Sequence, residues 1–508
     1  MTADRRSTIC PICGAGAWAR AAWQKQLVEA KRECGFEYIR FHGLLAEDMF
    51  VCHEVNGRIQ YNWYYIDALY DFLLETGVRP VVEFGFMPPA LASGDATQFW
   101  WKGDITPPKS LDRWEELIEA LVRHWAERYG LEEIRRWYYE VWNEPNLIAF
   151  WTGTKSEYFE MYRRTVQAVK RVDSQLRVGG PATSNFVPDS RFDGERQDSS
   201  NITPPRMDEM DDLPWHGVWV EDFLRFCEKE GLPVDFVSCH PYPTDWALDG
   251  NGVGRTCSRG KDSIITDMTW VRNVVDRSAY PQAEIHLTEW SSTPSPRDCT
   301  HDGLPAADYI IRSNLNCAKL ANSLSYWVFT DIFEENGGGP EAFHGGFGLM
   351  NMHGIRKPAW HAYRFLNLLG DELADRQEES IVTRKADGSV QLLAWNYARD
   401  LRTAPPRAVY PDHDAARAIG RMGDPRTLSM TLTGLKPGAV FTLERMAEED
   451  TATFLWDRMG RPASLTRAQE NALLAVAPRK TCLTADDQGC LTLDITLAPW
   501  EIVCLYED

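Results

Sequence analysis

Residues 138–145 read Tyr-Tyr-Glu-Val-Trp-Asn-Glu-Pro, an apolar run that is followed at once by a polar turn. Aromatic and β-branched residues in such a run are typical of a buried strand. Residues 284–290 read Glu-Ile-His-Leu-Thr-Glu-Trp and repeat the arrangement. The two runs predict that Glu144 and Glu289, 145 positions apart (289 − 144), each lie at the carboxyl end of a β-strand.

Apolar runs of this kind alternate with amphipathic helical segments from residue 7 to about residue 350. The eight predicted strands span residues 8–13, 38–42, 80–86, 138–142, 176–180, 236–240, 284–288 and 324–329. One helical stripe is formed by Ile66, Leu69, Tyr70, Leu73 and Leu74, and another by Trp114, Leu117, Ile118, Leu121 and Trp125. Eight strand–helix units predict an α/β fold, a (β/α)8 TIM barrel over residues 7–365, with its active site at the carboxyl ends of the strands.

The hydrophobic pattern of the sequence changes after residue 365. Short alternating runs at 390–395, 429–432 and 491–497 are separated by turn residues, which is typical of antiparallel strands. We therefore expect an accessory β-sandwich over residues 366–508, which the short segment 1–6 could join. The stretch 400–426 is rich in Pro, Asp, Arg and Ala and is expected to form a surface loop.

Composition narrows the class of partner. The chain has 508 residues, 44% of them hydrophobic, and a formal net charge of −20. This charge disfavours nucleic acids and anionic membrane surfaces, and neutral substrates suit it best. No run approaches the roughly 18 to 20 apolar residues of a membrane span, and the first residues lack the apolar core of a secretory signal. We expect a cytoplasmic protein, and the sequence leaves a homo-oligomer open.

Cysteine usage agrees with a reducing compartment. Twelve cysteines in a chain of this length are too few for a dense disulfide framework, and Cys239 and Cys504 sit inside apolar strand candidates. Cys10 and Cys13 have the spacing of half a zinc site, but no second pair with that spacing follows. The sequence predicts neither a metal site nor a cofactor.

Glu144 and Glu289 have the chemistry that glycosidic bond cleavage requires. One carboxylic acid must protonate the departing oxygen, and one carboxylate must meet the anomeric carbon. A single glutamate at a strand end is more often a solvated loop residue. Two of them on the same rim of one barrel favour a catalytic pair.

Further motifs resemble one family of enzymes. They are residues 39–43 (Ile-Arg-Phe-His-Gly), 179–182 (Gly-Gly-Pro-Ala), 239–242 (Cys-His-Pro-Tyr) and 326–335 (Tyr-Trp-Val-Phe-Thr-Asp-Ile-Phe-Glu-Glu). Together with Asn-Glu-Pro at 143–145 and Thr-Glu-Trp at 288–290, they resemble glycoside hydrolase family 39, particularly its β-xylosidases. The likeness implies a retaining enzyme of the clan whose catalytic glutamates follow barrel strands four and seven.

The resemblance also implies roles for individual residues. Glu144 would be the general acid/base, with a raised pKa, and Glu289 the nucleophile, with the two carboxyls about 5 to 5.5 Å apart. Asn143 would donate to the sugar 2-hydroxyl, or else cap the loop. Arg40 would hold Glu289 ionised, or else form a structural salt bridge.

Other positions would contact the sugar. His42, His240 and Tyr242 match sugar-contacting positions of the family, with simple packing at a strand end as the alternative. Trp327 would form an apolar floor under the ring. Glu334 and Glu335 would accept hydrogen bonds from the outer hydroxyls, or else belong to a solvated acidic loop.

The expected substrates are β-xylosides or short xylooligosaccharides, with the exact sugar left open. The α-L-iduronidases of the family must accommodate a substrate carboxylate, which the acidic pair at 334–335 would repel. Arg255, Arg259 and Lys261 could offset that repulsion, but we expect their loop to be exposed. β-Glucosidase, β-galactosidase and arabinoside-releasing activities remain alternatives, as does a non-catalytic carbohydrate-binding protein. No role is assigned to the loops at 185–212 and 244–262.

Overall fold

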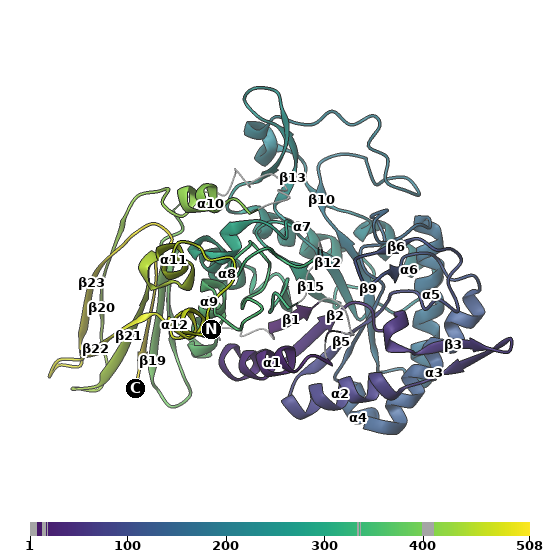
Figure 1. Cartoon of the computed structure of the whole chain (residues 1–508), viewed down its shortest axis with the longest axis horizontal. Coiled ribbons are helices and arrows are strands. Elements are labelled where there is room, and N and C mark those ends of the chain that lie inside the picture. Colours follow the sequence, from purple (N-terminus) through teal and green to yellow (C-terminus); the bar gives the residue numbers. More distant parts are fainter. Residues whose placement is uncertain (1–7, 13–16, 18, 333–334, 336, 399–410) are drawn as a thin grey trace.

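Eight parallel strands close into a barrel (Figure 1). The structure is a computed structural model that describes residues 8–12, 17, 19–332, 335, 337–398 and 411–508. In chain order the barrel strands are β1 (Thr8–Ile12), β2 (Tyr38–Phe41), β5 (Arg79–Phe84), β8 (Tyr138–Val141), β9 (Arg177–Ser184), β12 (Phe236–His240), β15 (Glu284–Trp290) and β16 (Ser323–Tyr326). All eight predicted strands are present, and β1 pairs with both β2 and β16 to close the ring. The predicted TIM barrel is confirmed.

Helices follow the strands and cover the barrel from outside. They are α1 (Ala21–Cys34), α2 (Tyr64–Thr76), α3 (Leu111–Tyr129), α4 (Leu131–Ile134), α5 (Lys155–Val172), α6 (Val220–Glu230), α7 (Ser263–Arg277), α8 (Leu304–Cys317) and α9 (Pro358–Leu368). The predicted stripe of α2 is buried except for the half-buried Leu74, and the helix ends where Gly77 takes a left-handed conformation. Helix α5 begins with a capping box between Thr154 and Glu157. No helix within the described ranges is long and apolar enough to cross a bilayer.

Small hairpins and 3-10 turns elaborate the loops between these elements. The strand pairs are β3 (Cys52–Val55) with β4 (Arg58–Tyr61), β6 (Thr97–Gln98) with β7 (Gly103–Asp104), β10 (Phe186–Val187) with β11 (His216–Gly217), and β13 (Thr244–Leu248) with β14 (Gly254–Ser258). The 3-10 turns in this half include η2 (Glu47–Met49), η3 (Met207–Asp212) and η4 (Cys299–Asp302). The loops at 185–212 and 244–262 are thus partly ordered into β10, η3 and the β13–β14 hairpin.

The expectation that the loop at residues 255–261 is exposed is wrong for Arg259. Its side chain is buried and donates two hydrogen bonds to the buried Asp267, at 2.8 and 2.5 Å. Its guanidinium also lies 4.1 Å from the ring centre of Trp215. Pairing with a carboxylate and an aromatic face lets an arginine be buried where composition alone suggests exposure.

The C-terminal part is a two-layered β-structure. One layer has the order β17 (Glu372–Gln377), β18 (Ser380–Arg384), β19 (Val390–Trp395), β24 (Ile502–Glu507), β21 (Val440–Met446) and β22 (Arg479–Thr484), and the other pairs β20 (Arg426–Leu432) with β23 (Leu491–Leu497). Leu392, Phe441 and Leu505 of the first layer form one core with Leu428 and Leu497 of the second. The predicted sandwich is confirmed.

Helical segments interrupt this part without a clear sequence signal. They are α10 (His413–Ile419), η5 (Glu448–Asp450), α11 (Ala452–Arg458) and α12 (Arg467–Leu474). Helix α10 falls inside the stretch 400–426 that we expected to be a loop, whose residues 400–410 lie outside the described ranges. The expectation was wrong for residues 413–419, where Asp412 caps the helix through the backbone N–H of Ala415.

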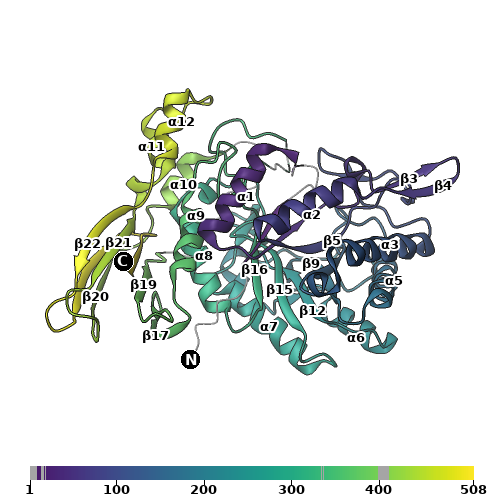
Figure 2. The same cartoon turned by 90° about the horizontal axis from the view of Figure 1, so that it is seen from below.

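The sandwich and the barrel share one hydrophobic core. Trp360 and Phe365 of α9 belong to the same buried cluster as Trp395, Trp500 and Ile502 of the C-terminal part. Arg364 of α9 also pairs with the buried Glu444 of β21 at 2.5 Å. In Figure 2, α9 lies between the barrel and β19. The last barrel helix therefore serves both parts of the molecule.

Candidate active site

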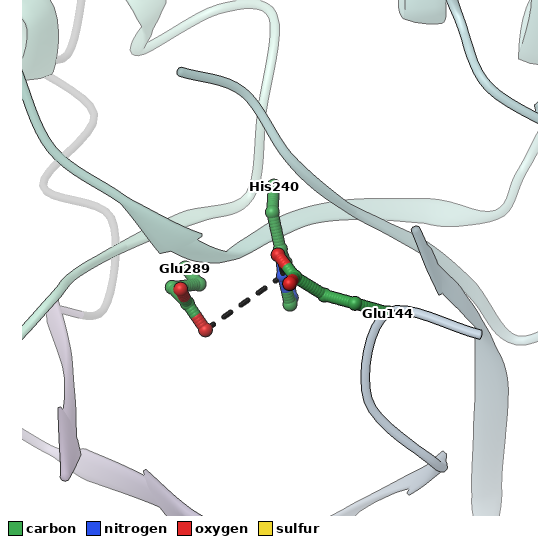
Figure 3. Close-up of side chains that lie close together, drawn as sticks. All are labelled: Glu144, His240 and Glu289. Carbon is green, nitrogen blue, oxygen red and sulfur yellow. Dashed lines mark hydrogen bonds and ion pairs between the residues drawn. The ribbon is translucent and has the colours of Figure 1, made fainter. Parts of the chain in front are cut away.

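Two glutamates meet at the carboxyl ends of β8 and β15. Figure 3 shows Glu144, His240 and Glu289 facing one another. One oxygen of Glu144 and one of Glu289 lie within 4.8 Å of each other, and both residues are buried. Retaining glycosidases hold their carboxyls about 5 to 5.5 Å apart, whereas inverting enzymes leave about 6.5 to 9.5 Å for a water molecule. The spacing favours the retaining geometry.

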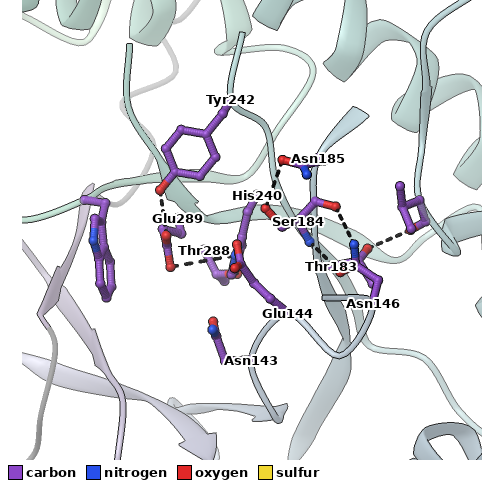
Figure 4. Close-up of polar contacts among 12 residues, drawn as sticks. Asn143, Glu144, Asn146, Thr183, Ser184, Asn185, His240, Tyr242, Thr288 and Glu289 are labelled. Atoms are coloured by element: carbon purple, nitrogen blue, oxygen red, sulfur yellow. Dashed lines mark hydrogen bonds and ion pairs between the residues drawn. The ribbon is translucent and has the colours of Figure 1, made fainter. Parts of the chain in front are cut away.

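The backbone after β8 aims Glu144 at this site. Trp142 and Glu144 adopt positive φ angles of 69° and 44°, so the chain turns sharply as the strand ends. The Glu144 N–H donates to the carbonyl of Ala182 on β9 at 2.9 Å. Asn146 then exchanges two 3.0 Å hydrogen bonds with the backbone of Ser184, seen in Figure 4. This turn is tied to the neighbouring strand at both ends, a role for Asn146 that the sequence did not indicate.

Glu289 lies among hydrogen-bond donors and a cation. Tyr242 donates to its Oε1 at 2.6 Å, and Nη1 of Arg40 lies 3.6 Å from its Oε2. Burial and the neighbouring Glu144 carboxyl raise the pKa of Glu289 well above its ordinary value, while Arg40 and Tyr242 oppose that rise. Two interacting carboxyls titrate as a unit, so the pair keeps a proton at a pH where isolated carboxyls would be ionised.

Arg40 is a buried cation surrounded by acceptors. Its Nε donates to Glu140 at 2.5 Å, and its Nη2 lies 2.9 Å from both Glu83 and Asn143 Oδ1. Although burial opposes it, the charges of Glu140, Glu83 and Glu289 raise the pKa of Arg40. Because the Asn143 oxygen faces Arg40, the Asn143 Nδ2 is left as a buried donor without a partner among the described residues. This amide donor is available to a ligand hydroxyl.

His240 is fully buried, and both its ring nitrogens have partners. Nδ1 lies 2.9 Å from Oε1 of Glu144, and Nε2 lies 3.1 Å from the hydroxyl of Thr288. That hydroxyl donates to Glu140 at 2.7 Å. Burial and the positive charge of Arg40 lower the pKa of His240 well below its ordinary value, so the imidazole is neutral. Thr288 and Glu140 were not among the predicted site residues.

Aromatic residues form another side of the site. The His42 ring lies 4.9 Å from the Trp327 ring and 6.0 Å from that of Phe99, and His42 Nδ1 contacts Glu83 at 2.6 Å. The Trp327 indole N–H donates to Glu335 at 2.9 Å. These contacts join three of the predicted sugar-binding residues, while Glu334 lies outside the described residues.

The loop that carries Trp327 is anchored by a buried ion triad. Lys357, just before α9, lies 2.7 Å from Asp302 and 2.6 Å from Asp331, and all three side chains are almost fully buried. The two carboxylates raise the pKa of Lys357 against the effect of burial. Asp331 follows Trp327 by four positions, so the triad holds the aromatic wall in place.

The cluster of Glu144, His240 and Glu289 also has a spacing that a divalent ion could bridge, since one atom of each lies within 4.8 Å of the others. The contacts already described account for the same atoms. Tyr242 engages Glu289, and His240 engages Glu144. We therefore interpret the cluster as a carboxyl pair with its hydrogen-bonding neighbours.

Comparison with known proteins identifies the family of the chain. The family model described as glycosyl hydrolases family 39 matches residues 3–193 and 214–489. A β-xylosidase of Caldicellulosiruptor saccharolyticus is 36% identical over 501 residues, covering 97% of this chain and 93% of the relative. A β-xylosidase of Geobacillus stearothermophilus is also 36% identical, covering 95% and 89%.

A solved structure agrees along the whole chain. The monomeric β-xylosidase of Caulobacter crescentus CB15 superimposes with a TM-score of 0.83 at 33% identity, covering 99% of this chain and 96% of that one. The family match, the near-complete coverage and the paired glutamates at the ends of β8 and β15 lead to one assignment: the chain belongs to glycosyl hydrolase family 39.

Proposed function

We propose that this protein is a retaining β-D-xylosidase that releases xylose from short xylooligosaccharides. The observation that carries the proposal is the pair of buried carboxyls, Glu144 and Glu289, within 4.8 Å of each other on one rim of the barrel. The two relatives matched over nearly their full length are named β-xylosidases, which supports xylose as the sugar. Both catalytic carboxyls are present, which argues against a purely carbohydrate-binding role.

The reaction proceeds by double displacement. In the first step an oxygen of Glu289 bonds to the anomeric carbon as the glycosidic C–O bond breaks, and Glu144 gives its proton to the departing oxygen. In the second step water attacks the anomeric carbon, Glu144 takes a proton from that water, and Glu289 leaves as a carboxylate. Two inversions at one carbon retain its configuration.

The surrounding residues support these steps. Arg40 and Tyr242 stabilise the negative charge of Glu289 before attack and after its release. The buried Nδ2 of Asn143 donates to the sugar 2-hydroxyl, a bond that strengthens toward the oxocarbenium-like transition state. His42 and Trp327 line the sugar ring, and Glu335 accepts hydrogen bonds from its outer hydroxyls.

The charges near the site favour a neutral sugar over a uronic acid. Glu335 places a carboxyl beside Trp327, where it would repel a substrate carboxylate. The three cations that could offset this are already paired: Arg255 with Asp249, Arg259 with Asp267, and Lys261 with Glu378. An α-L-iduronide would therefore enter without a free cation from this loop.

A panel of aryl glycosides tests the proposal. We expect kcat/KM for the β-D-xyloside to exceed the values for the β-D-glucoside, the α-L-arabinoside and the α-L-iduronide by about tenfold or more, because one misplaced substituent costs about 1–3 kcal/mol. NMR of the first-formed sugar should show the β-anomer. Glu289→Gln is the matched inactive control. Inactivity of the wild type on the whole panel, or a preference for the iduronide, would overturn the proposal.

The C-terminal sandwich, residues 366–508, is proposed to be an accessory unit. The predicted catalytic and sugar-binding residues, from Arg40 to Glu335, all precede it in the chain. Its described contacts with α9 are packing and ion pairs. We assign it the task of supporting the last barrel helix.

A further inference from the structure

A chain of hydrogen bonds runs from Glu144 into the barrel interior. It passes from Glu144 to His240 on β12, then to Thr288 on β15, and ends at Glu140 on β8, with distances of 2.9, 3.1 and 2.7 Å. His240, Thr288 and Glu140 are all fully buried. Water therefore has no access to replace any member of the chain, and each group must find its partner within it.

The direction of these hydrogen bonds follows from counting hydrogens. Thr288 has one hydroxyl hydrogen, and it is donated to Glu140. Toward His240 the hydroxyl oxygen can only accept, so the Nε2 of His240 carries a hydrogen. A neutral imidazole carries one N–H, which leaves Nδ1 as an acceptor. The atom that lies 2.9 Å from Nδ1 is Oε1 of Glu144, so Glu144 must supply the hydrogen.

We propose that Glu140, Thr288 and His240 form a positioning relay that fixes the proton of the carboxyl pair on Glu144. The inference rests on the proposed retaining mechanism and adds three residues that act through the acid. The relay decides which carboxyl is the acid. Glu289 faces the donors Tyr242 and Arg40, and its Oε2 lies 3.7 Å from Nδ1 of His240, whereas Oε1 of Glu144 lies at hydrogen-bond distance from that acceptor, 2.9 Å.

The relay acts in both steps of the reaction. When Glu144 has given its proton to the departing oxygen, its carboxylate faces the unprotonated Nδ1 of His240, an unfavourable contact between two acceptors. This contact favours return of a proton from the attacking water to Glu144. The relay itself gains and loses no proton, so atoms and charges balance as in the two-step displacement.

The charges around His240 keep the relay in this state. The titratable groups that face His240 are Arg40 on β2 and His42 beside it, Glu83 on β5, Glu140 on β8, Glu144 after β8 and Glu289 on β15. Arg40 lies among them as a fixed cation whose Nε contacts Glu140. Burial and this cation disfavour a second proton on the imidazole, and a doubly protonated ring would point an N–H at Glu144.

Thr288→Val tests the relay, because it removes the hydroxyl and keeps the shape. Without that acceptor the His240 tautomer is free to reverse, so we expect Glu144 to lose its proton at lower pH. The kcat/KM for xylobiose, which needs acid assistance, should fall about tenfold or more, while kcat/KM for 2,4-dinitrophenyl β-D-xyloside should change by less than about twofold. The alkaline limb of the xylobiose pH profile should move to lower pH.

Two controls separate the relay from a general loss of structure. Thr288→Ser restores the hydroxyl and should recover the wild-type pH profile. Thr165→Val removes another fully buried threonine hydroxyl, on α5, and should lower only stability. Equal losses on both substrates with an unshifted pH profile in Thr288→Val would overturn the relay.

Neutron diffraction from deuterium-exchanged wild-type crystals gives a test that needs no variant. We expect deuterium on Nε2 of His240 and on Glu144, with none on Nδ1, and deuterium on Nδ1 would overturn the relay. The outcome is separate from that of the substrate panel. A wild type that prefers another β-glycoside would overturn the xylosidase proposal, while the relay would still be tested on that sugar.

Discussion

The phenolic oxygen of Tyr242 lies 2.6 Å from Oε1 of Glu289 and donates its hydrogen to it. Burial, followed by the charges of Glu289 and Glu144, raises the pKa of Tyr242 well above its ordinary value. The phenol therefore stays protonated at neutral pH. Glu289 thus has one permanent donor that does not depend on the protonation of the carboxyl pair.

Tyr242→Phe should lower kcat/KM for an aryl β-D-xyloside by about 10- to 100-fold. The lost hydrogen bond stabilises the charge on Glu289, which changes most between the ground state and the transition state. Tyr309→Phe is a matched control, because that buried phenol on α8 has no hydrogen-bond partner within the described ranges. Activity of Tyr242→Phe equal to that of the control would contradict this role.

Azide should distinguish the two glutamates. In Glu289→Ala the cavity admits azide to the anomeric carbon, and the product should be a glycosyl azide of inverted configuration. In Glu144→Ala the glycosyl-enzyme still forms from activated substrates, and azide should give the retained product. NMR of the isolated glycosyl azides determines the anomeric configuration of both products. Inversion by Glu144→Ala, or rescue of neither variant, would mean that our assignment is reversed or wrong.

Glu335→Gln should raise KM for the xyloside about tenfold with a smaller effect on kcat. A hydrogen bond to a charged group contributes about 1.5–3 kcal/mol, and the amide keeps the shape while removing the charge. Steady-state kinetics with an aryl β-D-xyloside measure the change. Glu132→Gln on the exposed surface of α4 is the control. An unchanged KM would place Glu335 outside the sugar site.

His361 on α9 should make stability fall as the solution becomes acidic. Burial, with the charges of Arg364 and Arg356, lowers its pKa from 6.5 to about 3. Between these values the unfolded chain binds a proton that the folded protein does not, so stability is lost from pH 6.5 downward. The loss is about 2 kcal/mol at pH 5, and His240 and His286 add to it in the same direction.

Urea unfolding at pH 7.5 and pH 5 measures this effect. His361→Gln should reduce the difference in unfolding free energy between the two pH values. His353→Gln, at an exposed position, is the matched control and should leave the difference unchanged. A His361 variant with the full wild-type pH dependence would contradict the prediction.

The barrel could be predicted from the sequence because each of its strands is a short apolar run between turn residues. The same pattern placed Glu144 and Glu289 on one rim. Glu140 and Thr288 could not be predicted as site residues because they point inward from within strands. The role of a polar residue there depends on its partners on other strands. Only the folded barrel brings together these residues, which are 148 positions apart.

Other features depended on contacts that the sequence does not reveal. Arg259 is buried because Asp267 accepts its hydrogen bonds and the ring of Trp215 lies against its guanidinium. Its polar neighbours in the sequence indicated an exposed side chain instead. Helices α11 and α12 are only 7 and 8 residues long, too short for a clear periodic stripe. Their apolar residues Trp456 and Leu473 are buried against Phe343 of the loop after β16.

The core shared by α9 with Trp395, Trp500 and Ile502 has a consequence for engineering by module exchange. A sandwich taken from another protein would have to present the same apolar surface to α9 and a carboxylate in place of Glu444 to meet Arg364. Cutting the chain near residue 365 would leave Trp360 and Phe365 facing water. Barrel and sandwich should therefore melt in a single calorimetric transition and be exchanged only together with α9.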